Sequence, residues 1–278
     1  FKDKLFICDW TFGSIYTVDM DENGSSYVGT KKEFLNGQPL NISAMRFGPD
    51  GHMYFLVGGR NTASKLYRVR YIGNSSQGYV KALVANQPLR DLRHSLEAFH
   101  GNPNGGMEAV SKAWPYLSHS DRPIRYAARL AIENQPVNIW LEKVFNEQNS
   151  RGIIYACIAL CRHGDPSLSN RILHKLNHVS FDSLVIDDQL ALLRAYALCF
   201  IRLDKPSAEN IKNVIDRLDP FFPGDDEHVN TELCRVLSYL NAPNVVRKTI
   251  ALMKVTETKT LNYDKEMLAR HEYGKDIL

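Results

Sequence analysis

The first 71 residues contain six short strand-like segments, and this small number of strands constrains the fold more than any other feature of the chain. Alternating apolar, β-branched and aromatic residues mark the segments at 5–10, 14–20, 26–34, 42–48, 52–58 and 65–71. Turn residues stand between them at Asp21-Glu22-Asn23-Gly24 and Pro49-Asp50-Gly51. Each segment should therefore fold back antiparallel on its predecessor, which predicts a meander.

A meander of this kind is the internal unit of a β-propeller blade. A propeller ring needs roughly 16 or more strands before its unpaired edges disappear. Six strands amount to about one and a half blades. We therefore expect a partial antiparallel β-propeller that belongs to a longer polypeptide, and we expect any catalytic centre shared among blades to lie mostly outside these residues.

From about residue 104 the apolar residues follow the helical period of 3.6. Apolar-rich runs are each followed by a proline, at Pro136, Pro166, Pro206 and Pro243, and a shorter amphipathic segment separates one run from the next. Paired helices that recur every 30 to 40 residues are typical of an α-solenoid, and HEAT-like repeats fit the spacing best. A compact, irregular helix bundle is the competing architecture.

The predicted fold class is thus α+β multidomain, a partial antiparallel β-propeller followed by an α-helical HEAT-like solenoid. We place the partial propeller at 1–75, a linker at 76–103, the helical repeats at 104–254 and a second linker, towards a further module, at 255–278. Asp121-Arg122-Pro123 and Asp165-Pro166-Ser167 read as helix starts, because an acidic cap precedes a proline in the first turn.

Composition excludes several classes of function. The net charge is only +3, so neither half has the basic surplus that binding to nucleic acid requires. No run of 18 or more apolar residues is present, and we predict no membrane span. The five cysteines form no C-x-x-C or C-x-x-C-H pattern, so neither a zinc knuckle nor haem attachment is encoded in these residues.

Candidate site residues in the strand half are Arg60 and Asp9. Arg60 follows two glycines at the end of an apolar strand, where backbone and guanidinium could approach an anionic cofactor. The alternative is an arginine that is solvated or paired in a flexible loop. The stretch 19–24 matches half of an EF-hand calcium loop, but the twelfth position is Thr30 and strands flank it, so we favour a hairpin turn and assign no metal site.

In the helical half, Arg122, Arg125 and Arg129 share one helical face and could present three guanidinium groups to a phosphate or an acidic peptide. We favour a ladder of ion pairs, because no basic surplus accompanies them. His174 and His178 also share a face, but the Glu of a zinc hydrolase motif is missing between them. Four cysteines stand in apolar helical patterns and are expected to be small core residues, namely Cys157, Cys161, Cys199 and Cys234. Burial should make Cys157 and Cys161 inert.

Several elements of the strand half resemble glucose/sorbosone dehydrogenase-like proteins. The resemblance covers about residues 1–72. It is carried by the runs Leu5-Phe6-Ile7-Cys8-Asp9-Trp10, Gly13-Ser14-Ile15-Tyr16, Phe47-Gly48-Pro49-Asp50-Gly51-His52-Met53-Tyr54, Gly58-Gly59-Arg60 and Leu66-Tyr67-Arg68-Val69. It implies a sugar dehydrogenase that depends on pyrroloquinoline quinone and calcium and uses a catalytic histidine. The segment that would hold this histidine is not represented, so no catalytic residue is assigned and enzyme activity stays open.

The helical half resembles exported, notably bacterial, multidomain proteins in which such a propeller precedes HEAT-like repeats and often a cytochrome c. This resemblance is carried by the run from Asp121 to Arg129 with the nearby Trp114 and Trp140, and the segments Leu193-Arg194-Ala195-Tyr196 and Asn230-Thr231-Glu232-Leu233-Cys234 add to it. It implies a periplasmic or extracellular location and a haem module downstream. The predicted function is a fragment of a secreted quinoprotein-like sugar oxidoreductase, whose repeats act as spacer or as scaffold for a protein or electron-transfer partner. The alternative is a non-catalytic module that binds carbohydrate or protein.

Overall fold

The computed structural model describes residues 4–59, 62–73, 85–255 and 265–269. The chain divides into two compact units, one formed by Phe1–Asn86 with Lys259–Leu278 and the other by Gln87–Thr258. The segment predicted as the first linker contains a helix, α1 (Gln87–Glu97), which belongs to the second unit. Leu89, Leu92 and Leu96 explain it, because residues three and four apart share a helix face.

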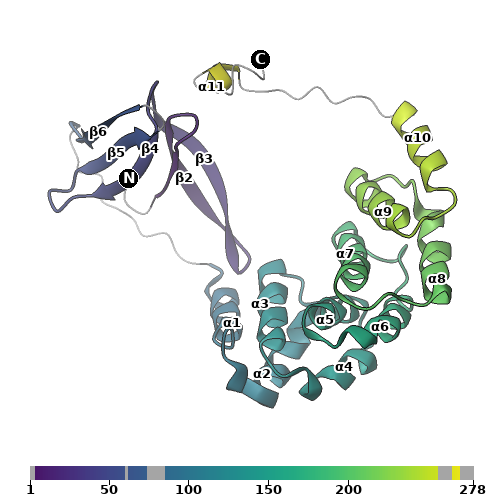
Figure 1. Cartoon of the computed structure of the whole chain (residues 1–278). Coiled ribbons are helices and arrows are strands. Elements are labelled where there is room, and N and C mark those ends of the chain that lie inside the picture. The colour runs from purple at the N-terminus through teal and green to yellow at the C-terminus, as the bar shows by residue number, and fades with distance from the viewer. Residues whose placement is uncertain (1–3, 60–61, 74–84, 256–264, 270–278) are drawn as a thin grey trace. The chain divides into compact units, whose positions relative to one another are not determined.

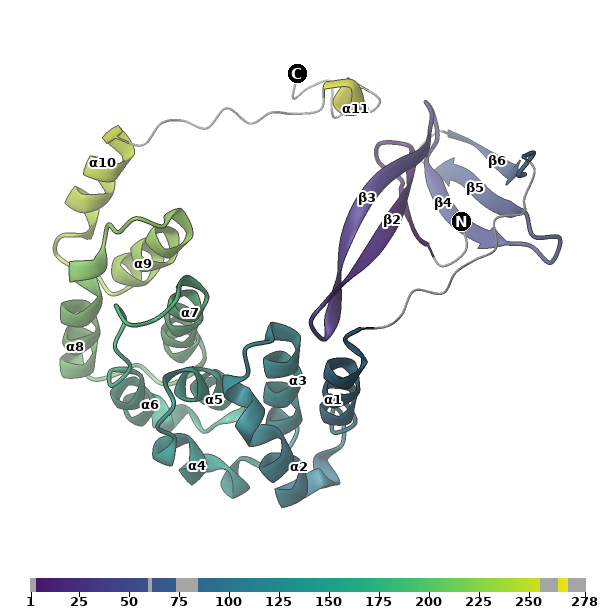
Figure 2. The same ribbon diagram turned by 180° about the vertical axis from the view of Figure 1, so that it is seen from behind.

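The first unit contains two antiparallel sheets (Figure 2). One has the order β1 (Leu5–Asp9), β2 (Ser14–Asn23) and β3 (Ser26–Asn36), and the other has the order β4 (Ile42–Phe47), β5 (Met53–Gly59) and β6 (Thr62–Val69). Gly24 and Gly51 adopt positive φ values of 55° and 75° in the two predicted turns. A short helix, α11 (Lys265–Ala269), lies in the segment predicted as the second linker.

Side chains from both sheets share one core. Its buried members are Ile15, Leu40, Ile42, Met53, Phe55 and Val57. The Phe6 ring on β1 contacts the Phe47 ring on β4 edge to face, with centroids 5.7 Å apart. Trp10 Nε1 donates to the carbonyl oxygen of Gly58 (3.0 Å), so the end of β1 is attached to β5.

The predicted partial β-propeller is wrong. The described strands form two three-stranded sheets and no closed sheet, in place of a four-stranded blade and part of the next. The predicted pairing fails between β3 and β4: the Gly37 backbone N–H donates to Gly13 O (3.0 Å), and the chain then carries Leu40 into the shared core. Burial of Leu40 and the other core side chains between the two sheets takes the place of hydrogen bonds between β3 and β4.

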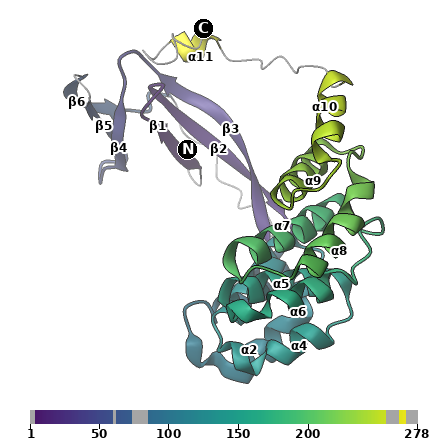
Figure 3. The ribbon, with the colours of Figure 1, turned by 45° about the vertical axis from the view of Figure 1, so that its right-hand side comes forward.

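The second unit is helical. Helices α3 (Arg122–Glu133), α5 (Ser150–His163), α7 (Ile186–Arg202) and α9 (Glu227–Tyr239) follow α1, and each of these five contacts the next in the series (Figure 1). Between them lie α2 (Gly106–Ala113), α4 (Leu141–Asn146), α6 (Ser169–Leu176) and α8 (Ala208–Leu218), which pack against the series, and α10 (Val245–Val255) packs on α9 (Figure 3). Short 3₁₀ helices complete the unit at Pro103–Gly105, Trp114–Ser118, Val137–Ile139, Pro166–Leu168 and Asp219–Phe221.

The predicted helix starts are confirmed. The Asp121 carboxylate accepts from the backbone N–H of Ile124 (3.0 Å) and caps α3, and Asp165 caps the turn at Pro166 in the same way. Residues with period 3.6 bury a continuous core, whose largest fully buried side chains include Trp140 and Tyr196.

The predicted HEAT-like solenoid is corrected as well. The helices of the second unit have unequal lengths, from 6 residues in α4 to 17 in α7, so successive pairs are not copies of one unit. The fold class that the structure supports is α+β, with two small antiparallel sheets and a separate set of packed helices. Among the described helices, none is both long enough and apolar enough to cross a bilayer.

Candidate functional site

Of the two predicted site residues of the first unit, only Asp9 lies in the described part of the chain. Asp9 ends β1, and its Oδ1 accepts from the backbone N–H groups of Thr11 (2.9 Å) and Phe12 (3.0 Å), so this carboxylate holds the turn before β2. Arg60 lies outside the described residues. Asp19, from the calcium-like stretch, lies in β2 and pairs with Lys4 and Lys32.

We assign no calcium or quinone site to the described part of the first unit. Calcium takes six to eight oxygen ligands. Over the residues that the structure describes, no group of three or more His, Cys, Asp or Glu side chains is placed to hold a metal ion. No redox step is therefore assigned to these side chains.

The second unit contains a groove of about 410 Å³ formed by α3, α5 and α7. Its lining is dominated by five arginines, namely Arg122, Arg125, Arg129, Arg162 and Arg194. Two tyrosines and several apolar side chains complete the walls, and Asp187 is the one carboxylate among the lining residues. We call this feature the arginine groove. Its lining carries a strong excess of positive charge, although the whole chain is nearly balanced.

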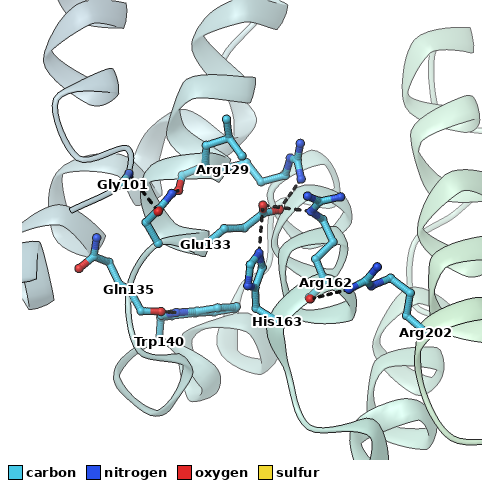
Figure 4. Close-up of polar contacts among 10 residues, drawn as sticks. Gly101, Arg129, Glu133, Gln135, Trp140, Arg162, His163 and Arg202 are labelled. Atoms are coloured by element: carbon cyan, nitrogen blue, oxygen red, sulfur yellow. Dashed lines mark hydrogen bonds and ion pairs between the residues drawn. The ribbon is translucent and has the colours of Figure 1, made fainter. Parts of the chain in front are cut away.

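Two of the five arginines share one buried carboxylate. Glu133, at the end of α3, is only 5 % exposed. It pairs with Arg129 on its own helix and with Arg162 on α5 (Nε–Oε2 3.0 Å), and His163 Nε2 lies 3.4 Å from the same oxygen (Figure 4). Arg202 Nη2 donates to the carbonyl oxygen of Arg162 (3.2 Å). This cluster fixes α3, α5 and α7 to one another at one end of the groove.

Arg125 is also fixed from within the unit. It is only 2 % exposed, and its Nη1 donates to the carbonyl oxygens of His119 (2.7 Å) and Ser120 (2.8 Å). Its guanidinium lies over the Tyr155 ring, 5.2 Å from the centroid. Hydrogen bonds to carbonyls and a cation–π contact hold the charge in place but leave it positive. Arg125 therefore contributes a fixed cation to the groove floor.

Arg122 and Arg194 differ from the other three. Both side chains are exposed at the groove, Arg122 on α3 and Arg194 on α7. Within the described parts of the chain, neither forms an ion pair or a hydrogen bond. The groove thus presents two free guanidinium groups beside three held ones. Guanidinium groups bind carboxylates and phosphates in bidentate fashion, so the arrangement suits an anionic ligand.

The expected ladder of ion pairs is present only in part. The pairs of Arg129 and Arg162 with Glu133 match it, whereas Arg122 has no carboxylate partner among the described residues. The sequence placed Arg122, Arg125 and Arg129 on one face. It gave no signal for Arg162 and Arg194, because only the packing of α5 and α7 brings them to that face.

A larger hollow of about 720 Å³ is lined by residues of α4, α5, α6 and α8. The Lys and Arg side chains that line it already have hydrogen-bond or ion-pair partners within the unit. Lys175 Nζ donates to two carbonyl oxygens, those of Phe145 (2.8 Å) and Glu147 (2.6 Å), and Arg171 pairs with Glu142 (3.2 Å). The two histidines predicted to share a face, His174 and His178, do so there: their ring centroids lie 4.6 Å apart, and His178 Nδ1 forms a hydrogen bond with the carbonyl oxygen of His174 (2.7 Å). The arginine groove is therefore the better candidate site.

Three of the four cysteines of the helical unit are not candidates for chemistry. Cys157, Cys161 and Cys199 are buried in the core, as expected, whereas Cys234 is only partly buried. Burial raises the pKa of the Cys157 thiol. In Cys161 a hydrogen bond with Cys199 and burial raise the pKa together. A protonated, buried thiol is a poor nucleophile and a poor metal ligand.

In comparisons with known proteins, no protein-family model, no curated protein and no solved structure matches this chain.

Proposed function

We propose that the helical unit is a protein-binding module that holds an acidic segment of a partner protein in the arginine groove. The observation that carries this proposal is the pair of exposed arginines, Arg122 and Arg194, which face one groove without a carboxylate partner among the described residues. Packed helices hold the groove in shape, so binding requires little rearrangement of the unit.

The apolar part of the lining favours a carboxylate-bearing peptide over nucleic acid. The groove places Ile158, Leu190 and Leu198 between its arginines, and apolar side chains of this kind suit a polypeptide better than a sugar–phosphate backbone. The chain as a whole has a net charge of only +3. Arginine is enriched in protein–protein interfaces, where its fork-shaped group pairs with Asp and Glu side chains.

The test is fluorescence anisotropy of a labelled oligoglutamate peptide titrated with the full chain. We expect saturable binding that weakens between about 50 mM and about 200 mM salt, because exposed charge pairs are screened. Arg122→Glu and Arg194→Glu should each weaken binding about tenfold, the loss expected for one charge-assisted hydrogen bond. Arg122→Glu puts an acidic residue into the first turn of α3, which the helix dipole favours, so folding should be unaffected.

Arg247→Glu is the matched control. Arg247 lies exposed on α10, in the same unit but outside the groove, and its replacement changes the net charge by the same amount. It should bind oligoglutamate within about twofold of the unchanged chain. Equal weakening by Arg247→Glu and Arg122→Glu, or no binding at all, would refute the proposal.

Sugar oxidation in an exported protein remains a second proposal, and it rests on the resemblance of residues 1–72 alone. Its test is reduction of an electron-accepting dye by glucose after addition of pyrroloquinoline quinone and Ca²⁺ to the full chain. Dye reduction that depends on both additions would support it, and its absence would count against it. Because the described residues assign no step to this reaction, protein binding is our preferred function.

A further inference from the structure

The arginine groove is continued by a second, apolar pocket on the neighbouring pair of helices. This pocket has a volume of about 260 Å³ and lies between α7 and α9. Arg194 lines both the arginine groove and this pocket, so the two hollows adjoin at that side chain. We call the second hollow the apolar pocket.

The walls of the apolar pocket are hydrophobic. Phe200 and Val236 are buried, and Ala197 lies beside them. Two large side chains are left open to solvent at its edge: Ile201 is 70 % exposed and Tyr239 is 62 % exposed. The Tyr239 ring stacks on Phe200, with centroids 5.7 Å apart, and its hydroxyl donates to the carbonyl oxygen of Phe200 (3.4 Å). Tyr239 is therefore held in place as a rigid wall.

The apolar pocket differs from the arginine groove in the charge of its lining. Arg235 pairs with Glu232 on α9, so these two largely neutralise each other. Arg194 forms no ion pair within the described parts of the chain, and it marks the point at which the surface changes from basic to apolar. A ligand that crosses Arg194 would therefore meet guanidinium groups on one side and hydrophobic walls on the other.

The size of the apolar pocket limits what can fill it. Sites for small-molecule ligands usually have volumes of about 300–1,000 Å³. At about 260 Å³ the pocket lies below that range, and it is open at the edge formed by Ile201 and Tyr239. One large apolar side chain fits it better than a separate ligand, and such buried anchors dominate the affinity of many protein interfaces.

We infer that the partner segment carries a large apolar residue directly beside its acidic stretch, and that this residue occupies the apolar pocket while the acidic residues pair with Arg122 and Arg194. This inference rests on the proposed function and specifies the partner further. Acidic segments that lack the adjacent apolar residue would bind in the arginine groove alone and more weakly.

The test compares three kinds of labelled peptide on the full chain: oligoglutamate alone, oligoglutamate with Phe at one end and oligoglutamate with Ala at one end. The added residue is placed at the C-terminal end in one version and at the N-terminal end in the other. In the better of the two versions, the Phe peptide should bind about tenfold more tightly than the Ala peptide, since burial of a large apolar side chain has an effect of this size. Ile201→Ser and Tyr239→Ala should reduce that preference to about twofold or less and leave the affinity for oligoglutamate unchanged. Both replaced side chains are exposed, so folding should persist.

The outcomes separate the inference from the proposed function. Arg122→Glu should weaken all three peptides by the same factor. Binding of oligoglutamate with no preference for Phe, or with a preference that survives Ile201→Ser and Tyr239→Ala, would overturn the inference and leave the proposed function standing. Failure of all three peptides to bind would overturn both.

Discussion

Glu147 connects four elements of the helical unit through one side chain and its own carbonyl. Its carboxylate accepts from Trp114 Nε1 (2.7 Å) and from the backbone N–H groups of Gln148 and Asn149 (2.9 Å each), and its carbonyl oxygen accepts from Lys175 on α6. Burial raises the pKa of this carboxyl group, but the three hydrogen bonds and the charge of Lys175 outweigh burial, so the pKa lies below its ordinary value.

Glu147→Gln should therefore destabilise the protein in a pH-dependent way. A depressed folded-state pKa contributes stability above the unfolded pKa, about 4.3 for Glu, and this contribution is lost as the pH falls through the folded-state pKa. We expect a loss of about 1 kcal/mol in the free energy of unfolding at pH 7, a small value because the carboxylate is partly solvated. The difference should shrink as the pH falls below about 4.

Urea unfolding at several pH values measures this effect, with Glu108→Gln as control. Glu108 is exposed on α2 and has no partner among the described residues, so its replacement should change stability little at any pH. If the loss in free energy of unfolding caused by Glu147→Gln stays constant from pH 7 to about pH 3, the role assigned to the carboxylate is contradicted.

At the scale of elements, helix α3 depends on its N-terminal cap. Asp121 caps the helix that carries Arg122, Arg125 and Arg129, and Pro123 lies in its first turn. Asp121→Ala should lower the free energy of unfolding by about 1 kcal/mol, because the amide of Ile124 loses its acceptor. Asp121→Asn keeps a capping oxygen and should stay within about 0.5 kcal/mol of the unchanged protein. Equal loss in both variants, measured by urea unfolding, would show that the cap is not the cause.

Local signals made most of the elements predictable from the sequence, with the exception of α1 and α11, whereas contacts between distant residues could not be predicted. Asp121 and the prolines that follow each apolar run mark helix ends because capping and the missing proline N–H act within one turn. The pairing of β4 with β5 was predicted, but the missing pairing of β3 with β4 was not, because no local pattern reveals that Leu40 between them is buried in the core shared by the two sheets. The arginine groove shows the same limit, since Arg194 lies 65 residues beyond Arg129 in the chain.

At the scale of the whole molecule, the two units have separate cores. The core of the first unit runs through residues of β2, β4 and β5 and the segment before β4, and the core of the second extends from Leu96 to Val245 with no shared member. Each unit therefore buries its own apolar surface, which is the condition for independent folding.

Residues 87–258, produced alone, should fold and should bind oligoglutamate as the full chain does. Circular dichroism should show a helical protein with a cooperative thermal transition, and the transition temperature should lie within about 5 °C of the corresponding transition in the full chain. A polypeptide without cooperative unfolding would show that the helical core needs the rest of the chain.

The most direct measurement of the central claim is a phenylglyoxal footprint of the full chain by mass spectrometry, with and without saturating oligoglutamate. Phenylglyoxal modifies exposed guanidinium groups, so Arg122, Arg194 and Arg247 should all react in the free protein. With peptide bound, the account predicts that Arg122 and Arg194 become protected while Arg247 reacts at its original rate. Unchanged reaction of Arg122 and Arg194, or equal protection of Arg247, would contradict it.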